Sequence, residues 1–191
     1  MKKYIFYVLF FFLFVNNSVK ADDIRDFQIE GMSVSTSLLE YMTKEEIKKA
    51  EENSTLYPNN QYIVIFSNKP SDKYDHVEIT YDIKDKDYSI LSIVGKVIYP
   101  DNYIGCKNKK KNIVKIFKST FPKSKIDQFE ETHYHDNKSM VDTSDFYLIN
   151  GGVARVSCTD WTKELGDKFG WLDVMKISIS NEKMVDYLSS L

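Results

Sequence analysis

The chain has 191 residues, of which 42% are hydrophobic and 28% charged, and its formal net charge at pH 7 is −2. A chain of this length can bury a core as one domain without added cross-links. The slight excess of acidic residues argues against generic nucleic-acid binding, which depends on a basic surface.

Residues 1–21 predict an export signal. Two lysines open the segment, a nearly unbroken apolar run covers residues 4–15, and small residues suited to cleavage stand at 19–21. We therefore expect a mature chain of residues 22–191, periplasmic or secreted, without a stable membrane span. Its net charge would be about −5, because the leader holds three lysines and no acid. An uncleaved anchor is the alternative, although a membrane-spanning helix needs roughly 20 apolar residues.

Two cysteines in an exported chain suggest one disulfide, between Cys106 and Cys158. Such a bond would close a loop of about 50 residues and stabilise the fold by roughly 4 kcal/mol in the chain-entropy model. The alternative is two buried free thiols.

The first half predicts helical turns followed by strands. Thr43 and Glu46 have the spacing of a capping box, so a helix is expected to begin at Thr43. Apolar periodicity predicts strands over residues 62–67, 77–83 and 88–99. Gly95 lies on the apolar face of the third strand and marks a bulge or close packing.

A second helix is expected from the cap Asn102 to about Phe121, with Ile113, Ile116 and Phe117 in its core stripe. Its earlier half carries a lysine cluster that is either a solvated surface or a basic patch for an anionic partner. The members of this cluster are Lys107, Lys109, Lys110 and Lys111. Residues 126–135 suggest an irregular strand and residues 136–144 a polar loop.

Residues 145–161 predict a hairpin around Asn150-Gly151-Gly152, because these residues tolerate the positive φ of tight turns. Both faces of the first arm look buried, and the second arm has a small apolar face. A phosphate-binding glycine loop is the alternative, disfavoured because no Lys-Ser/Thr motif follows and no helix begins there. A short helical or looped excursion is expected over 162–170, followed by a strand over 171–179 and a final helix capped near Asn181.

The predicted fold class is α+β, with mostly antiparallel sheet and flanking helices, because the connecting loops are short. The order of elements also allows two similar helix-plus-sheet halves, an outline shared with the secreted β-lactamase inhibitor proteins. Element order alone does not determine function.

His133 and His135 are the candidate metal ligands, since both imidazoles would share one face of an extended segment. Glu131 and Asp136 are close in sequence, but His76 is remote and no HExxH or CxxC motif is present. We expect no cofactor. No G-x-S-x-G elbow occurs, and a disulfide would use both thiols that a cysteine nucleophile would need.

Two tryptophans, Trp161 beside Asp160 and Trp171, could line a sugar-binding surface. Packing in the core or at an edge is the alternative, because large aromatic side chains are generally well buried.

The segments DFQIEGMS, SLLEYMTKEEIKK, GCKNKKKNIV and VSCTDW together make the chain resemble a group of small exported proteins from marine alphaproteobacteria of the SAR11 type. The resemblance covers most of residues 22–191 and implies export and a single disulfide. It implies no activity and no functional residue.

These observations favour a non-catalytic periplasmic domain that binds a protein or an envelope component. The alternatives are a hydrolase acting on sugar or peptidoglycan, and a carrier of a small ligand or metal.

Overall fold

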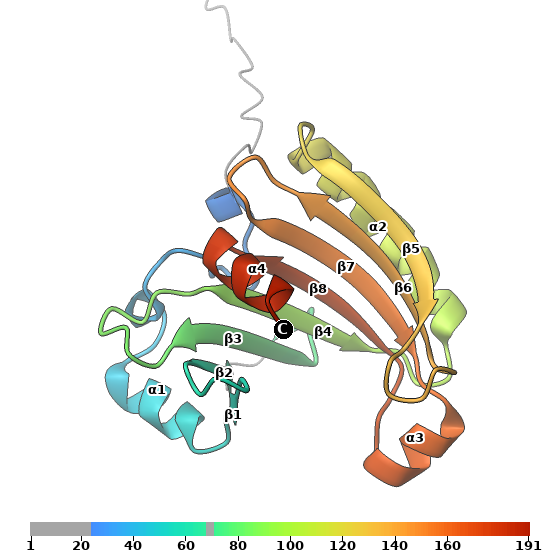
Figure 1. The fold of residues 1–191 in the computed structure, drawn as a ribbon, viewed down its shortest axis with the longest axis horizontal. Helices are drawn as coiled ribbons and strands as arrows, with labels where there is room; N and C mark the ends of the chain where they lie inside the picture. Colours follow the sequence, from blue (N-terminus) through green and yellow to red (C-terminus); the bar gives the residue numbers. More distant parts are fainter. Residues whose placement is uncertain (1–23, 68–70) are drawn as a thin grey trace, which may run out of the picture.

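The protein, seen here in a computed structural model that describes residues 24–67 and 71–191, is built on one antiparallel sheet of eight strands in the order β1-β2-β3-β4-β8-β7-β6-β5 (Figure 1). The leader predicted at residues 1–21 lies outside the described residues. The expected α+β class with antiparallel pairing is confirmed. The strands are β1 (Thr55–Leu56), β2 (Tyr62–Phe66), β3 (His76–Asp82), β4 (Ser92–Ile98), β5 (Lys125–Thr132), β6 (Met140–Tyr147), β7 (Val153–Asp160) and β8 (Val174–Ser180).

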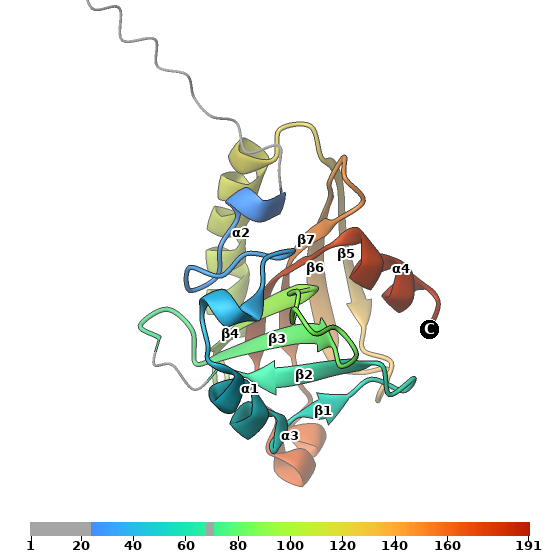
Figure 2. The ribbon, with the colours of Figure 1, turned by 90° about the vertical axis from the view of Figure 1, so that its left-hand side faces the viewer.

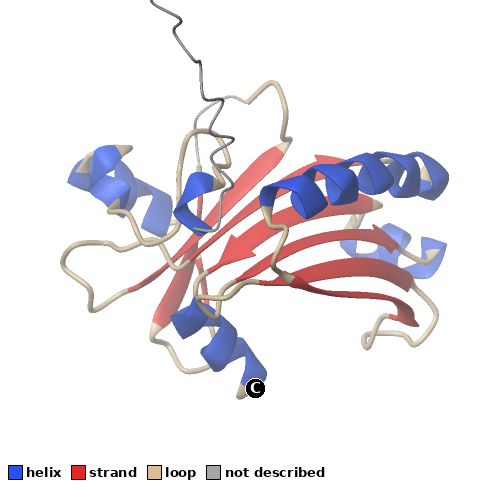
Figure 3. Cartoon of the chain, turned by 90° about the horizontal axis from the view of Figure 1, so that it is seen from above, coloured by secondary structure: helices blue, strands red, loops and turns tan. Residues whose placement is uncertain are grey.

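The helices divide the two faces of the sheet between them. The long helix α2 covers one face, whereas α4 lies on the opposite face, which is turned to the viewer in Figure 1 (Figures 2 and 3). We call the face that carries α4 the open face. No helix within the described ranges is long and apolar enough to cross a membrane. The helices are α1 (Lys44–Glu51), α2 (Tyr103–Thr120), α3 (Lys163–Phe169) and α4 (Glu182–Ser189).

The main core lies between α2 and the sheet. Phe117 is its centre, with edge-to-face contacts to Phe27, Phe121 and Phe146 at ring distances of 5.0, 5.9 and 5.3 Å. The predicted disulfide is present: Cys106 of α2 is bonded to Cys158 of β7, with their Cα atoms 6.0 Å apart.

The apolar stripe of α2 differs from the prediction at one position. Ile116 is 58% exposed, and the buried stripe runs instead through Cys106, Lys110, Ile113 and Phe117. This stripe keeps the helical spacing i, i+4, i+7, i+11, but a lysine occupies its second position. The apolar pattern alone therefore did not identify the buried face of α2, because this face includes Lys110. Lys110 is buried, and its charge is compensated by an ion pair with Asp142 of β6.

The strand β6 begins earlier than expected, since residues 140–144 were predicted to lie in a loop. Polar side chains in this strand find partners across the sheet: Ser144 accepts a hydrogen bond from Gln128, and Asp145 forms a two-bond ion pair with Arg155. The prediction that both faces of the hairpin's first arm are buried is wrong, because Tyr147 and Ile149 are exposed.

Gly95 confirms the prediction of close packing. A Cβ atom at this position would lie 2.4 Å from the ring of Tyr74, although the pairing with Val77 continues without a bulge. The strand therefore requires glycine here to admit the tyrosine.

The capping box of α1 is confirmed. The Thr43 hydroxyl accepts from the Glu46 backbone N–H at 3.2 Å, and the Glu46 carboxylate accepts from the Thr43 N–H at 2.7 Å. We expect Thr43→Ala to lower the free energy of unfolding by about 1 kcal/mol, because it removes the acceptor for the Glu46 N–H. Urea titration measures this loss, and Thr43→Ser should retain most of the stability. Equal losses in both variants would contradict the role of the hydroxyl.

Candidate functional site

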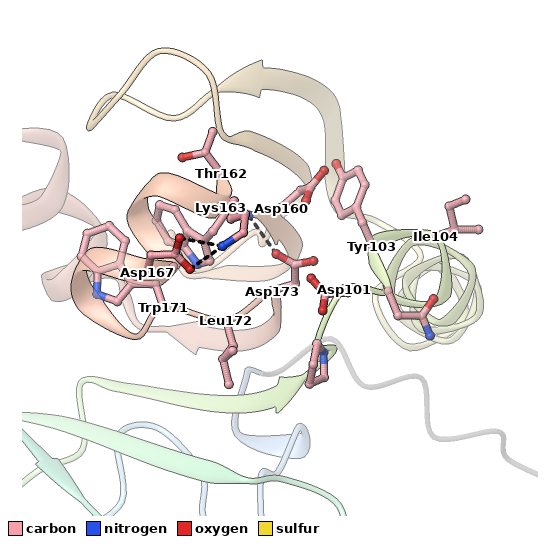
Figure 4. A pocket seen from close by; sticks show the side chains of 14 residues that line it. Asp101, Tyr103, Ile104, Asp160, Thr162, Lys163, Asp167, Trp171, Leu172 and Asp173 are labelled. Carbon is pink, nitrogen blue, oxygen red and sulfur yellow. Dashed lines mark hydrogen bonds and ion pairs between the residues drawn. The ribbon is translucent and has the colours of Figure 1, made fainter.

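Acidic side chains converge at the end of the sheet from which α3 projects. Between the start of α2 and the α3 segment lies a pocket with a volume of about 750 Å³ (Figure 4). Asp101, Asp160 and Asp173 lie around its middle, facing Tyr103, and Trp171 stands at its rim. We call this the acidic pocket.

Three different elements supply these carboxylates. Asp101 lies in the turn between β4 and α2, Asp160 ends β7, and Asp173 directly precedes β8. Asp173 is only 8% exposed, and one of its carboxylate oxygens accepts a hydrogen bond from the Trp161 backbone N–H at 2.9 Å. This bond fixes the chain direction where β7 leads into α3.

Nearby lysines neutralise other acids. Lys107 pairs with Glu130 at 2.9 Å, Lys110 with Asp142, and Lys163 with Asp167 at 2.6 Å. The first two pairs show that the predicted lysine cluster is not a uniform solvated surface. Within the described part of the chain, no lysine or arginine pairs with Asp101, Asp160 or Asp173. Lys163 also lines the pocket, but its ammonium pairs with Asp167, so these three carboxylates have no basic partner among the described residues.

The pKa values of two of these carboxyl groups are raised, and burial is the largest cause in both. Burial raises the pKa of Asp160. Burial also raises the pKa of Asp173, and the nearby charges of Asp160 and Asp101 add to this, although the Trp161 N–H opposes it. The Tyr103 hydroxyl donates a hydrogen bond to the Glu130 carboxylate. Burial, and then this contact with Glu130, raise the pKa of Tyr103. A positive group in the pocket would stabilise the ionised carboxylates.

An aromatic wall borders the acidic pocket. Trp161 and Trp171 form its centre, with ring centroids 4.5 Å apart, and Phe169 stacks on Trp171 at 5.0 Å. On the other side His133 lies 4.6 Å from Trp161, and His135 lies 5.2 Å from Trp171. Both tryptophans thus lie half-buried at a pocket, which is the placement that a ligand-binding surface requires.

A polar network holds this wall together. Asp136 accepts hydrogen bonds from the hydroxyls of Ser139 at 2.7 Å and Thr162 at 2.9 Å. The Ser139 hydroxyl in turn accepts from the Thr162 backbone N–H at 2.9 Å. The loop between β5 and β6 is therefore tied to the start of α3, which positions the histidines against the tryptophans.

The candidate metal ligands His133 and His135 lie in this loop rather than in a strand, because β5 ends at Thr132. Their rings stack in parallel, 5.2 Å apart with an angle of 4° between planes. The Nδ1 atom of His133 accepts a hydrogen bond from the His135 backbone N–H. Across residues 24–67 and 71–191, no three His, Cys, Asp or Glu side chains gather as a metal ion would need.

Sequence reasoning identified Asp160, Trp161 and Trp171 but missed Asp101 and Asp173. Neither aspartate belongs to a sequence motif. Asp101 follows β4 and Asp173 precedes β8, so only the pairing of these two strands brings them together. Comparison of the chain with protein-family models, curated proteins and solved structures finds no match. The functional conclusion has to come from the chemistry of these residues.

Proposed function

We propose that the protein is an exported, non-catalytic binding domain that holds a small organic cation in the acidic pocket. The observation that carries this proposal is the convergence of Asp101, Asp160 and Asp173, without a described cationic partner, beside two tryptophans. A volume of about 750 Å³ lies within the usual range for small-molecule sites.

The chemistry of the pocket favours an ammonium group on a carbon skeleton over a bare metal ion. The described acids do not gather closely enough to ligate a metal. A larger cation could reach separated carboxylates and present C–H groups to Trp161 or Trp171, with favourable cation–π attraction. Asp173 would be the central anchor, because it is the most buried of the three acids.

The proposed location is the periplasm or the extracellular space. The charged and apolar pattern of residues 1–21 and the Cys106–Cys158 bond support it. We also propose that the chain is related to the small exported SAR11-type proteins. A further proposal is that it consists of two similar helix-plus-sheet halves. The order of one helix followed by four strands, found at α1 to β4 and again from α2 to β8 if α3 is set aside, supports the second of these.

Asp160→Asn should reduce the affinity for tetramethylammonium at least tenfold and, at the same time, stabilise the protein at neutral pH. The native pKa of Asp160 is raised, so the folded state holds this proton more strongly than the unfolded state. Ionisation at neutral pH therefore costs folding free energy, and stability falls as pH rises through the interval between the two pKa values. The amide removes both this cost and the attraction for a cation.

Isothermal titration calorimetry at constant ionic strength measures the affinity, and urea unfolding at pH 7 measures the stability. Asp127→Asn is the matched control, because it removes the same charge from an exposed position on β5. Equal affinity in wild type and Asp160→Asn, or equal weakening by Asp127→Asn, would reject the acidic pocket as the site.

A hydrolase is the second candidate, favoured by the shared pocket of Asp160 and Asp173, both with raised pKa. A carboxyl group that keeps its proton could act as a general acid beside an ionised neighbour. Release of soluble sugars from peptidoglycan by the wild type, abolished in both Asp160→Asn and Asp173→Asn, would favour this activity. No release in any of the three proteins would leave the binding function.

A further inference from the structure

The open face of the sheet carries a row of basic side chains on three adjacent strands. His76 of β3 stands opposite Lys96 of β4, and Lys96 stands opposite Lys176 of β8. Directly opposed residues on antiparallel strands lie close enough for their side chains to interact, and like charges there are destabilising. The opposed Lys96 and Lys176 therefore lower the stability of the sheet unless negative charge compensates them.

Compensation from the protein is incomplete. Lys96 pairs with Glu78, and Arg155, the next basic residue on this face, forms its two-bond pair with Asp145. Among the residues that the structure describes, no carboxylate pairs with Lys176. Burial and the charge of Lys96 lower the pKa of the Lys176 ammonium, with Arg155 adding to the effect and Glu78 opposing it. The half-buried Lys176 ammonium thus has no ion-pair partner within the described ranges, and Glu78, which pairs with Lys96, only partly offsets its charge.

This row forms part of a pocket with a volume of about 450 Å³. Lys96 and Lys176 share its floor with the apolar side chains of Ile98 and Val174, which face the same side of the sheet. Trp161, Trp171 and Leu172 also line it, so the aromatic wall separates it from the acidic pocket. We call this second cavity the basic pocket.

All three histidines of the chain line the basic pocket. His133 and His135 belong to the loop between β5 and β6, and His76 approaches from β3. Tyr134 is 79% exposed between the two loop histidines, with ring centroids 4.5 and 4.4 Å from theirs. The pocket therefore combines cationic and imidazole donors with stacked rings and an apolar floor.

We propose that the basic pocket binds an organic anion: a carboxylate on a planar, apolar body. The carboxylate lies against the Lys176 ammonium, and the planar body lies between Ile98 and Val174 on the floor and the rings of the aromatic wall. Charge-assisted hydrogen bonds from lysine fix the anionic group, and ring contacts select the flat body. This site is independent of the cation proposed for the acidic pocket.

Benzoate is the probe, observed through the histidine ring signals in NMR spectra of the full protein at constant ionic strength. Because every histidine lines this pocket, shifts of these signals report on it directly. We expect saturable shifts with benzoate, and at least tenfold weaker binding of both benzyl alcohol, which lacks the charge, and inorganic phosphate, which lacks the ring. Equal binding of benzyl alcohol would overturn the role of the charge, and equal binding of phosphate would overturn the role of the ring.

Lys176→Met should weaken benzoate binding at least tenfold, whereas Lys176→Arg should bind within about threefold of wild type. Lys111→Met is the matched control, because it removes the same charge from an exposed position on α2. A second readout shows whether Lys176→Met retains the native pocket: the pKa of His133 should rise, since the charge of Lys176 contributes to lowering it. Wild-type affinity in Lys176→Met, or the same loss in Lys111→Met, would overturn the proposal.

Discussion

Replacement of Cys106 and Cys158 by alanine is expected to lower the free energy of unfolding by about 4 kcal/mol. The bond joins residues separated by 52 positions and links α2 to β7, an interior strand of the sheet. Without it, the unfolded chain gains the conformational freedom of a long loop. Urea unfolding of the oxidised wild type and of the double alanine variant measures the difference.

A control separates the bond from the packing of the side chains. Cys106 and Cys158 are both fully buried, so alanine also removes some van der Waals contacts. Wild type unfolded and refolded with a reductant keeps the sulfur atoms and should still lose most of the 4 kcal/mol. A loss below about 1 kcal/mol in both the reduced protein and the variant would contradict the expected contribution of the bond.

Asp142→Ala is expected to lower the free energy of unfolding by about 3 kcal/mol. It would leave the ammonium of Lys110 under α2 without its partner, and Lys110 is only 4% exposed. The loss is expected to be smaller for Lys110→Met, because the Asp142 side chain is 20% exposed and can be partly solvated. Urea unfolding of both variants gives the two values.

The double variant Lys110→Met/Asp142→Leu tests the interpretation of that pair. Replacing both charges with apolar side chains should recover most of the stability, since the main penalty comes from one uncompensated buried charge. Lys111→Met, one position along the same helix but exposed, should change stability by less than about 0.5 kcal/mol. Additive losses in the double variant would indicate that the two side chains contribute separately.

The elements that the sequence predicted well are those governed by local chemistry. The capping box at Thr43, the side-chain cap of α2 at Asn102 and the cap of α4 at Asn181 all form as expected. The small apolar face of Ala154, Val156 and Cys158 is fully buried. In each case the residues that determine the structure lie within a few positions of one another.

The prediction failed where a partner distant in sequence determines the environment of a residue. The sequence grouped Lys110 with three other lysines of α2. In the structure it is buried and pairs with Asp142, which lies 32 positions away in the sequence. Lys176 was not singled out from the sequence, because only the pairing of β4 with β8 places it opposite Lys96. Such juxtapositions depend on strand order, which short-range periodicity does not specify.

The same reason explains why the candidate site was only partly predicted. Asp160 and the two tryptophans were noticed as residue types, but their shared pocket depends on Asp101 and Asp173 from other connections. The two pockets of opposite charge share Trp161 and Trp171, a relation that depends on the three-dimensional path of the α3 segment.

Tryptophan fluorescence during titration with tetramethylammonium chloride tests the central claim most directly, because both tryptophans of the chain line the acidic pocket. At constant ionic strength, with sodium chloride as the reference salt, we predict a saturable change in the wild type that disappears in Asp160→Asn. A response that is identical for the two salts, or that persists unchanged in the variant, would contradict an organic cation in this pocket.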